Sequence, residues 1–328
     1  MARPLTIAAL GFWHVHAGDY ARRAQEHPGT ELVAVWDDDA ERGRAAAQAH
    51  SVEFVEDLDE LLARDDLDAV TVTTPTSAHR DVMVRAAEAG KHIFTEKLLA
   101  PTVAEAEEVI AAADAHGVRL VVSLPRLSHG YTRAVLDVLE SGGLGRLTYS
   151  RVRLSHAGAL QGWLPERFFD PGPAIGGALT DLGCHPVYLT QLFLGPSPET
   201  VTATYRSVTG RPVEDSAVVT AAYGDQSIGV IEAGFVGGTP FSIEIFGTEG
   251  SLAYSDGDGV LRVTGAASGG DGWRQVDVPG DGPDPFAQWV DHIRAGTRAD
   301  DNLRRAVDLT RLVVAANTAA ATGTATRP

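Results

Sequence analysis

The sequence predicts an α/β protein that begins with a doubly wound parallel sheet and continues into an α+β domain with a mostly antiparallel sheet. Strand and helix patterns alternate over residues 5–122, which is typical of a parallel sheet with helices on both faces. Between residues 201 and 278, short strand-like runs are separated by Gly and Asp turns. The length of 328 residues suits two domains of roughly 100–200 residues each.

The elements of the first part follow from apolar runs and their punctuation. Short apolar or β-branched runs predict strands over residues 5–10, 31–36, 52–55, 69–73, 92–94 and 119–122. Helices are predicted over 15–25, 40–49, 58–63, 78–89 and from the Thr102 cap to residue 115. Glu105, three residues after Thr102, completes a capping box, and Gly90 suits the residue just past a helix end.

The second part has fewer helices and more strands. Helices are predicted over 131–140 and 176–194, with a strand over 147–154 between them. Strand-like runs then fill residues 201–278, and two closing helices span about 286–316. We expect a first domain over 1–125 and a second over 126–328, with the closing helices packing back and the tail after Ala319 frayed.

Charge and cysteine content narrow the class of protein. The formal net charge of −17 repels nucleic acids and anionic membranes, so neither is an expected partner. The single cysteine, Cys184, cannot form an intrachain disulfide, which fits a reducing compartment. The apolar run at residues 5–12 is far shorter than the ~20 residues that span a bilayer, so we expect a cytoplasmic protein.

The loop after the first strand reads Gly11-Phe12-Trp13-His14-Val15-His16. A dinucleotide-binding fingerprint has glycines at its first, third and sixth positions, and here only Gly11 is kept. Either the loop takes another path and a histidine donates to a phosphate, or the histidines only cap the helix and pack. No Cys or carboxylate lies beside His14 and His16 at ligand spacing, so no metal is expected.

Asp37 ends the second strand, 26 residues after Gly11. An acid at this place accepts a hydrogen bond from the adenosine ribose and repels a 2′-phosphate. Asp38 and Asp39 follow, and no basic residue comes before Arg42. This favours NAD over NADP; the alternative is a solvated acidic turn that caps the next helix.

Two further segments end strands at the same edge of the predicted sheet. Thr73-Thr74-Pro75 follows the fourth strand and Glu96-Lys97 follows the fifth. Ligands of doubly wound sheets bind beyond the carboxyl ends of the strands, so Lys97 could bind and polarise a substrate hydroxyl. The alternative is a surface lysine paired with Glu96.

Asp181 and His185 place a carboxylate and an imidazole four residues apart, on one face of a continuous helix. This suits a general base oriented by an acid. Pro186 complicates the helix, because proline lacks the N–H and crowds residue 182. The alternative is a partly buried structural histidine.

Over nearly its whole length the chain resembles the glucose–fructose oxidoreductase/inositol dehydrogenase (Gfo/Idh/MocA) family. The segments that carry the resemblance are VAVWD at 33–37, TPTSAH at 74–79, AGKHIFTEK at 89–97, SGGLGRL at 141–147, GGALTDLGCH at 176–185 and FGTEGSL at 246–252. Leu98 stands where the family has proline after Glu-Lys, and Tyr188 stands where it has aspartate.

The resemblance implies a Rossmann domain and an α/β domain with a large open sheet that often forms dimers or tetramers. It implies catalysis by Lys97, Asp181 and His185 on a sugar, polyol or cyclitol. It also implies cofactor contacts from Gly11 to His14, Asp37, Thr73 to Pro75, His79, Glu96, Lys97 and Arg126. Arg126, His156 and Trp163 are the further candidates for the substrate pocket.

The function expected from the sequence is hydride transfer between NAD and a hydroxyl or carbonyl carbon of a sugar-like substrate. His185 would act as the base, Asp181 would orient it, and Lys97 would bind the reacting oxygen. Two alternatives stay open: a redox-neutral sugar enzyme with tightly bound NAD, and a non-catalytic member that has lost its cofactor. We expect a homodimer or homotetramer formed through the second domain.

Overall fold

The computed structural model describes residues 3–328, apart from the side chain of residue 271. The chain divides into two compact units. The first unit comprises the residues up to Ser123 together with Pro283–Val307, and the second comprises Leu124–Gly282 with Asp308–Pro328. The sequence placed Pro283–Val307 in the second domain, whereas its contacts assign it to the first unit. Within the described part of the chain, every helix is too short or too polar to cross a membrane.

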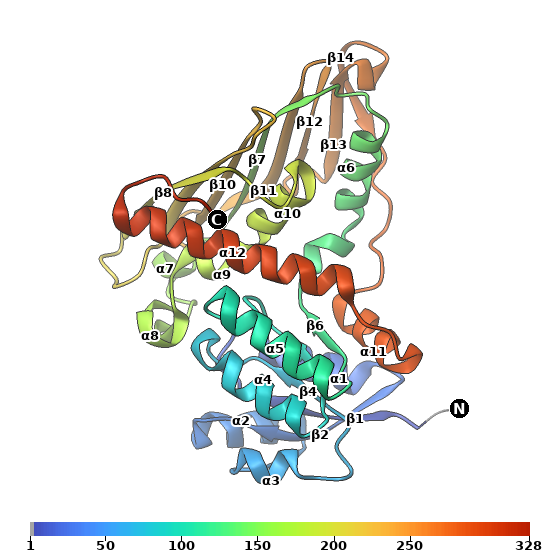
Figure 1. Ribbon diagram of the computed structural model, residues 1–328, viewed down its shortest axis with the longest axis vertical. Coiled ribbons are helices and arrows are strands. Elements are labelled where there is room, and N and C mark those ends of the chain that lie inside the picture. The colour runs from blue at the N-terminus through green and yellow to red at the C-terminus, as the bar shows by residue number, and fades with distance from the viewer. Residues whose placement is uncertain (1–2) are drawn as a thin grey trace. The chain divides into compact units, whose positions relative to one another are not determined.

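The first unit is built on a six-stranded parallel sheet in the order β3-β2-β1-β4-β5-β6. The strands are β1 (Leu5–Leu10), β2 (Thr30–Trp36), β3 (Glu53–Phe54), β4 (Ala69–Val72), β5 (His92–Thr95) and β6 (Leu120–Val122). The helices between them are α1 (Ala17–Glu26), α2 (Ala40–His50), α3 (Leu58–Leu62), α4 (His79–Glu88) and α5 (Val103–Ala115), of which α4 and α5 lie side by side (Figure 1). This order is the doubly wound dinucleotide-binding arrangement that the alternating pattern predicts.

The returning segment joins the first unit through aromatic packing and hydrogen bonds. Helix α11 (Pro285–Ala295) places Phe286 and Trp289 against Phe94 of β5, with ring centroids 5.5 and 5.7 Å apart. Trp289 also donates from Nε1 to the carbonyl oxygen of Arg119 at 3.1 Å. These contacts bury large apolar surfaces in the core of the sheet, which explains why a segment so distant in sequence belongs to this unit.

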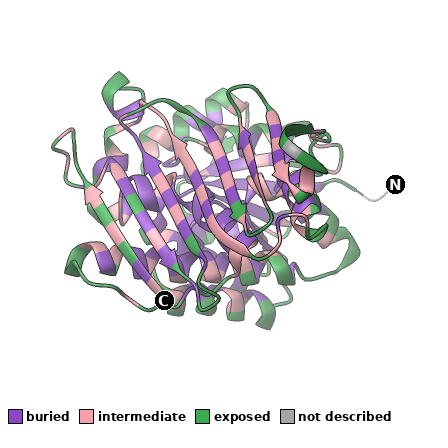
Figure 2. Cartoon of the chain, turned by 90° about the horizontal axis from the view of Figure 1, so that it is seen from above, coloured by how far each residue is buried: buried purple, intermediate pink, exposed green. Residues whose placement is uncertain are grey.

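The second unit is built on an eight-stranded sheet in the order β14-β13-β12-β11-β7-β10-β9-β8. Its strands are β7 (Leu147–Ser155), β8 (Thr200–Arg206), β9 (Ser216–Ala222), β10 (Ile228–Gly234), β11 (Thr239–Gly247), β12 (Gly250–Ser255), β13 (Val260–Gly265) and β14 (Gly270–Val276). Only β7 and β10 pair in parallel; the other neighbours are antiparallel. Buried and more exposed residues alternate along these strands, as expected when one face packs against helices (Figure 2).

Helices α6 (Gly130–Glu140), α9 (Ala178–Asp181) and α10 (Cys184–Leu194) contact strands of this sheet. The connection from β7 to β8 also contains the short helices α7 (Gly158–Gln161) and α8 (Pro171–Ala174). The prediction of one helix over 176–194 is therefore wrong. The break falls just before Pro186, which lies in the first turn of α10, where its missing N–H costs nothing, and a longer helix would bring its ring against residue 182.

The C-terminal segment is more ordered than the sequence predicts. Helix α12 runs over Asp300–Thr322, so it extends beyond the predicted end at residue 316. After it, Thr326 pairs with Val201 of β8 through two backbone hydrogen bonds of 2.8 and 2.9 Å. The prediction of a frayed tail is wrong, because backbone pairing with a sheet edge holds the end of the chain.

Candidate functional site

The register of the parallel sheet brings the predicted cofactor residues of the first unit into one row. The last paired residues of β2, β1, β4, β5 and β6 lie beside one another. The residues that follow them form the next row across the sheet: Asp37, Gly11, Thr73, Glu96 and Ser123. Hydrogen bonds of 2.8–3.0 Å from four of these backbone N–H groups continue the ladder by one step. This edge is where ligands of doubly wound sheets bind.

Gly11 packs directly on the end of β4. It has φ +81°, and a Cβ atom there would lie 2.8 Å from both N and Cα of Thr74, so only glycine fits. Trp13, at the place of the second fingerprint glycine, has a buried side chain. The backbone N–H of His14 donates to the carbonyl oxygen of Thr73 at 3.1 Å. The hydrogen bond from His14 to Thr73 therefore holds the loop beside the end of β4. This contact fixes a loop that lacks the second and third fingerprint glycines.

Asp37 is buried and makes more contacts within the protein than the sequence predicts. Its side chain is 0% exposed, and Arg42 approaches both carboxylate oxygens, with Nε at 2.9 Å and an NH2 group at 2.5 Å. It also accepts from the backbone N–H groups of Phe12 at 2.5 Å and Asp39 at 2.8 Å. Asp39, not Asp37, caps α2 by accepting from the N–H groups of Glu41 and Arg42. The first basic residue after the acidic run therefore reaches back to neutralise it.

Glu96 and Lys97 form a buried ion pair. Both side chains are 2% exposed, and Nζ of Lys97 lies 3.1 Å from Oε1 of Glu96. Burial alone would raise the pKa of Glu96, but the positive charges of Lys97, His16 and His14 outweigh it and hold the pKa well below its usual range. The alternative of a surface lysine does not hold, although the partner that it named, Glu96, is correct. The peptide bond between Lys97 and Leu98 is cis.

Two residues that the sequence analysis did not single out complete this network. The hydroxyl group of Tyr20 on α1 contacts Oε2 of Glu96 and lies 2.8 Å from the Oγ of Ser123. Burial raises the pKa of Tyr20 well above its usual value, and the neighbouring charge of Glu96 adds to the shift. The available signals were positional: Tyr20 lies one helical turn after His16, and Ser123 directly follows the sixth strand.

His14 and His16 meet the carboxylate of Glu96. Nδ1 of His16 lies 3.3 Å from Oε2 of Glu96, and the two imidazole centroids are 4.6 Å apart. One potential ligand atom from each of the three residues lies within 4.8 Å of the other two. No metal was expected from the sequence because no carboxylate stands near these histidines along the chain. That premise fails, because Glu96, directly after β5 and 80 residues from His16, supplies the carboxylate.

His79 lies inside the first unit and connects two of the loops. Its ring nitrogens face the carbonyl oxygens of Leu98 at 2.7 Å and Thr74 at 3.1 Å. Burial lowers the pKa of His79, although these two carbonyl groups oppose the shift. These two contacts tie the segment at 73–75 to the segment at 96–98. The buried Oγ1 of Thr74 has no hydrogen-bond partner within the described residues, so this polar group is unsatisfied in the structure.

The remaining predicted residues belong to the second unit. Arg126 lies over the ring of Phe241 at 4.0 Å and donates to the hydroxyl group of Tyr131 at 2.8 Å. Its guanidinium group therefore already has an aromatic face and a hydroxyl partner, and these hold it in place. Direct contact between Arg126 and a cofactor stays a prediction.

Asp181 and His185 do not share a helix, since Asp181 ends α9 and His185 lies in the first turn of α10. Nδ1 of His185 lies 2.9 Å from the hydroxyl group of Tyr188, which also accepts the backbone N–H of Arg126 at 3.1 Å. Tyr188 is the residue that replaces the usual aspartate of the resembling family. The sequence marked position 188 as a departure from the family, but it did not show that the hydroxyl group contacts His185.

His156 and Trp163 form an aromatic pair, with centroids 4.6 Å apart. His156 stacks on Phe235, while Trp163 remains 51% exposed. Burial lowers the pKa of His156, and the negative charge of Asp181 opposes this. The structure thus brings His156 close enough to Asp181 to interact electrostatically and into ring contact with Trp163, whose indole stays half exposed.

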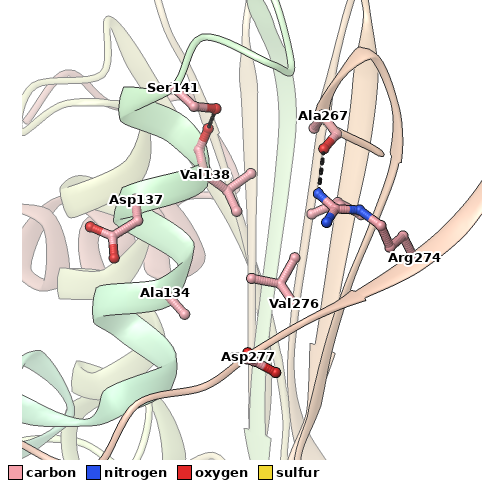
Figure 3. A pocket seen from close by; sticks show the side chains of 9 residues that line it. Ala134, Asp137, Val138, Ser141, Ala267, Arg274, Val276 and Asp277 are labelled. Carbon is pink, nitrogen blue, oxygen red and sulfur yellow. Dashed lines mark hydrogen bonds between the residues drawn. The ribbon is translucent and has the colours of Figure 1, made fainter. Parts of the chain in front are cut away.

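A separate hollow of about 280 Å³ lies in the second unit between α6 and strands β13 and β14 (Figure 3). Arg274 at its edge donates to the carbonyl oxygen of Ala267 at 3.1 Å. The side chains that line it are Ala134, Asp137, Val138, Ser141, Val263, Ala267, Arg274, Val276 and Asp277. This set shares no member with the site residues predicted from the sequence, so the hollow gives no support to that site.

Comparison with known proteins gives a family match in each of the two units. Residues 7–124 match the model of an oxidoreductase family with an NAD-binding Rossmann fold, and residues 132–253 match the Gfo/Idh/MocA C-terminal domain. The chain belongs to the Gfo/Idh/MocA family of oxidoreductases. The family confirms the resemblance, the Rossmann sheet and the second sheet that the sequence predicts.

Its relatives include enzymes of sugar metabolism. The chain is 32% identical over 278 residues to a dTDP-3,4-didehydro-2,6-dideoxy-α-D-glucose 3-reductase from Streptomyces violaceoruber, with 79% of this chain and 78% of that protein covered. Among solved structures, GenD2 from gentamicin A biosynthesis, in complex with NAD, has a TM-score of 0.84 at 26% identity and covers 100% and 97% of the two chains. The 3-ketoreductase KijD10 from Actinomadura kijaniata, with NADP and TDP-benzene, has a TM-score of 0.82 at 25% identity and covers 97% and 98%.

Proposed function

We propose that this chain transfers a hydride between a nicotinamide cofactor and a hydroxyl or carbonyl carbon of a sugar, polyol or cyclitol. The observation that carries the proposal is the buried Glu96–Lys97 ion pair at the carboxyl edge of the six-stranded sheet. An ammonium group kept charged in a dry site binds and polarises an oxygen more strongly than one in water. The sugar-acting relatives support the substrate class.

The residues at this edge suit a dinucleotide. When bound, the nicotinamide ring accepts or supplies the hydride. Gly11 gives the tight turn, and Thr74 offers a buried hydroxyl without a partner within the described residues. His79 holds the segments that carry Thr74 and Lys97 in fixed positions. The altered fingerprint at Trp13 is accommodated because its side chain is buried in the protein.

NAD is the proposed form of the cofactor. Asp37, Asp38 and Asp39 carry three carboxylates, and Arg42 is the one guanidinium group that contacts all three. The remaining negative charge disfavours a 2′-phosphate. Because Asp38 is exposed and Arg42 keeps its contact with the buried Asp37, an Asp38→Asn variant should narrow the preference for NAD over NADP, measured as the ratio of the two dissociation constants.

In the proposed reaction His185 exchanges the proton of the reacting oxygen and Lys97 binds that oxygen. Asp181 and Tyr188 are positioning residues for His185. The hydroxyl group of Tyr188 is fixed by the N–H of Arg126 and contacts Nδ1 of His185, which directs Nε2 of the ring outward as the exchanging nitrogen. His156 and Trp163 are proposed to contact the sugar, since the exposed indole face of Trp163 suits the C–H face of a ring.

The test is turnover of NAD or NADH by the purified chain with a panel of aldoses, polyols and their keto forms, followed by NADH absorbance. We expect Lys97→Ala and His185→Ala to lose most activity, while His116→Ala, a matched change at an exposed histidine, keeps it. Unchanged turnover in both site variants would overturn the mechanism. Substrate conversion without net NADH would instead indicate a redox-neutral enzyme.

Association through the second sheet is also part of the proposal. Ile228, Tyr149 and Phe246 lie in one row across β10, β7 and β11, and Tyr149 stacks on Phe246 at 5.1 Å. Ile228 and Phe246 are exposed apolar side chains on the face opposite to the buried residues of the same strands. Such a row is typical of a surface covered by a second copy of the chain.

A further inference from the structure

We propose that His14, His16 and Glu96 form a binding site for a divalent transition-metal ion. Two imidazoles and a carboxylate each offer a ligand atom, and these atoms lie within 4.8 Å of one another. The site goes beyond the proposed hydride transfer, which needs no metal. It also gives a role to the two histidines of the loop after Gly11, one of which, His16, stands at the place of the third fingerprint glycine.

The distances suit tetrahedral coordination. Zinc binds histidine nitrogen and carboxylate oxygen at about 2.0–2.2 Å, so two ligand atoms of one tetrahedron lie about 3.3–3.5 Å apart. Nδ1 of His16 and Oε2 of Glu96 are 3.3 Å apart. The ring centroids of His14 and His16 are 4.6 Å apart and the ring planes are inclined by 57°. A small rotation of the two rings would bring one nitrogen of each to the same ion.

The ligand atoms of the site determine which metal ions it would prefer. Imidazole nitrogens suit zinc, cobalt(II), nickel and copper, whereas magnesium and calcium prefer sites made of oxygen atoms. Two histidines and one glutamate are also the protein ligands of some catalytic zinc sites, where a water or a substrate oxygen takes the fourth position. The side chain of His16 is 39% exposed, while His14 and Glu96 are buried, so the ion would be reached from the side of His16.

The two oxygen atoms of the Glu96 carboxylate have different partners. Lys97 occupies Oε1 of Glu96, and the hydroxyl group of Tyr20 and Nδ1 of His16 face Oε2. Oε2 is therefore the proposed ligand atom, with Lys97 and Tyr20 fixing the carboxylate from outside the coordination sphere, as outer partners of metal ligands do. The positive charge of Lys97 lowers the affinity for a cation without removing the ligand set.

Binding requires a local change at each histidine. Nδ1 of His16 donates to Oε2 of Glu96 at 3.3 Å, so its proton must leave or move to Nε2 before Nδ1 coordinates an ion. Nδ1 of His14 accepts the backbone N–H of His16 at 3.2 Å. A neutral imidazole has only one unprotonated nitrogen, so coordination through either nitrogen replaces this bond. The loss of a hydrogen bond of this kind, about 1 kcal/mol, is small beside the about 10–16 kcal/mol that zinc sites gain in zinc-finger peptides.

The experiment uses the untagged full-length chain after treatment with a chelator. Calorimetric titration with Zn²⁺ should give one ion per chain, and Co²⁺ should produce the intense visible absorption of a tetrahedral complex. His16→Ala should weaken Zn²⁺ binding by more than the about 10–100-fold that loss of an outer-shell partner costs. Glu96→Gln should do the same, and His116→Ala, at an exposed site on the same unit, should leave binding unchanged.

The outcomes separate the proposal from its rivals. Zn²⁺ binding that is equal in the original chain and His16→Ala would overturn it and leave a hydrogen-bonded network only. If Glu96→Gln does not fold, the binding measurement on His16→Ala decides between the outcomes. The side chain of His16 is 39% exposed, so its replacement should disturb folding less than replacement of the buried Glu96. Metal binding is read without NAD or substrate, so its failure leaves the proposed oxidoreductase activity standing, and the reverse also holds.

Discussion

Replacement of Glu96 by glutamine tests whether the ion pair with Lys97 is buried and charged. The substitution keeps the shape of the side chain and removes the negative charge that faces Nζ of Lys97 at 3.1 Å. Removal of one partner from a buried pair costs about 3–5 kcal/mol, because the other charge stays in a site of low polarity. We expect the free energy of unfolding at pH 7 to fall by about that amount.

The loss of unfolding free energy in Glu96→Gln has an upper limit that depends on pH. Lys97 can give up its proton in the variant, which costs about 4.6 kcal/mol at pH 7 and about 1.9 kcal/mol at pH 9 for a lysine of ordinary pKa near 10.4. The unfolded variant then binds more protons than the folded one, so its stability rises with pH. The difference between Glu96→Gln and the original chain should therefore shrink to about 2 kcal/mol or less at pH 9.

Urea denaturation at pH 7 and pH 9 measures both effects, with tryptophan fluorescence as the signal. Trp13 and Trp289 are buried in the same unit as Glu96, so their emission reports its unfolding. Glu108→Gln is the matched control, because Glu108 pairs with Arg80 in solvent and its change should move the midpoint little. Equal losses in Glu96→Gln and Glu108→Gln would refute the reasoning.

Three further variants test other parts of the molecule. Gly11→Ala should destabilise the fold by more than the about 1–2 kcal/mol of a left-handed backbone, whereas Gly90→Ala, also left-handed but in open space, should cost only that amount in urea titrations. Tyr188→Phe removes the hydroxyl group that contacts His185, so kcat should fall about 5-fold with KM unchanged, and a larger change in KM than in kcat would contradict a positioning role. Phe246→Glu should shift light-scattering mass toward the monomer, and an unchanged mass would exclude this face as the contact.

The sequence was informative where local patterns decide the structure. The alternating apolar runs placed all six strands of the first sheet, and the register of that sheet then set Asp37, Gly11, Thr73 and Glu96 in one row. The capping box at Thr102 formed as expected. Such features depend on neighbours within a few residues, so periodicity and turn chemistry were sufficient to predict them.

The sequence missed one contact between distant residues, one local ion pair and one helix break. The carboxylate beside His14 and His16 comes from β5, so spacing along the chain could not show it. Arg42 reaches back to Asp37 because α2 begins directly after the acidic run, and the sequence did not predict this ion pair. The helix over 176–194 failed because a hydrophobic pattern continued across Pro186, and the backbone requirement of proline outweighed it.

The central claim is that the first unit binds a nicotinamide dinucleotide despite its altered loop, and calorimetry with NAD and NADP on the purified chain tests it most directly. We predict saturable binding of one NAD per chain, weaker binding of NADP, and a loss of affinity in Thr74→Val, which removes the buried hydroxyl group that is left without a partner in the described structure. Absence of binding for both dinucleotides to a chain that is folded by circular dichroism would contradict the account.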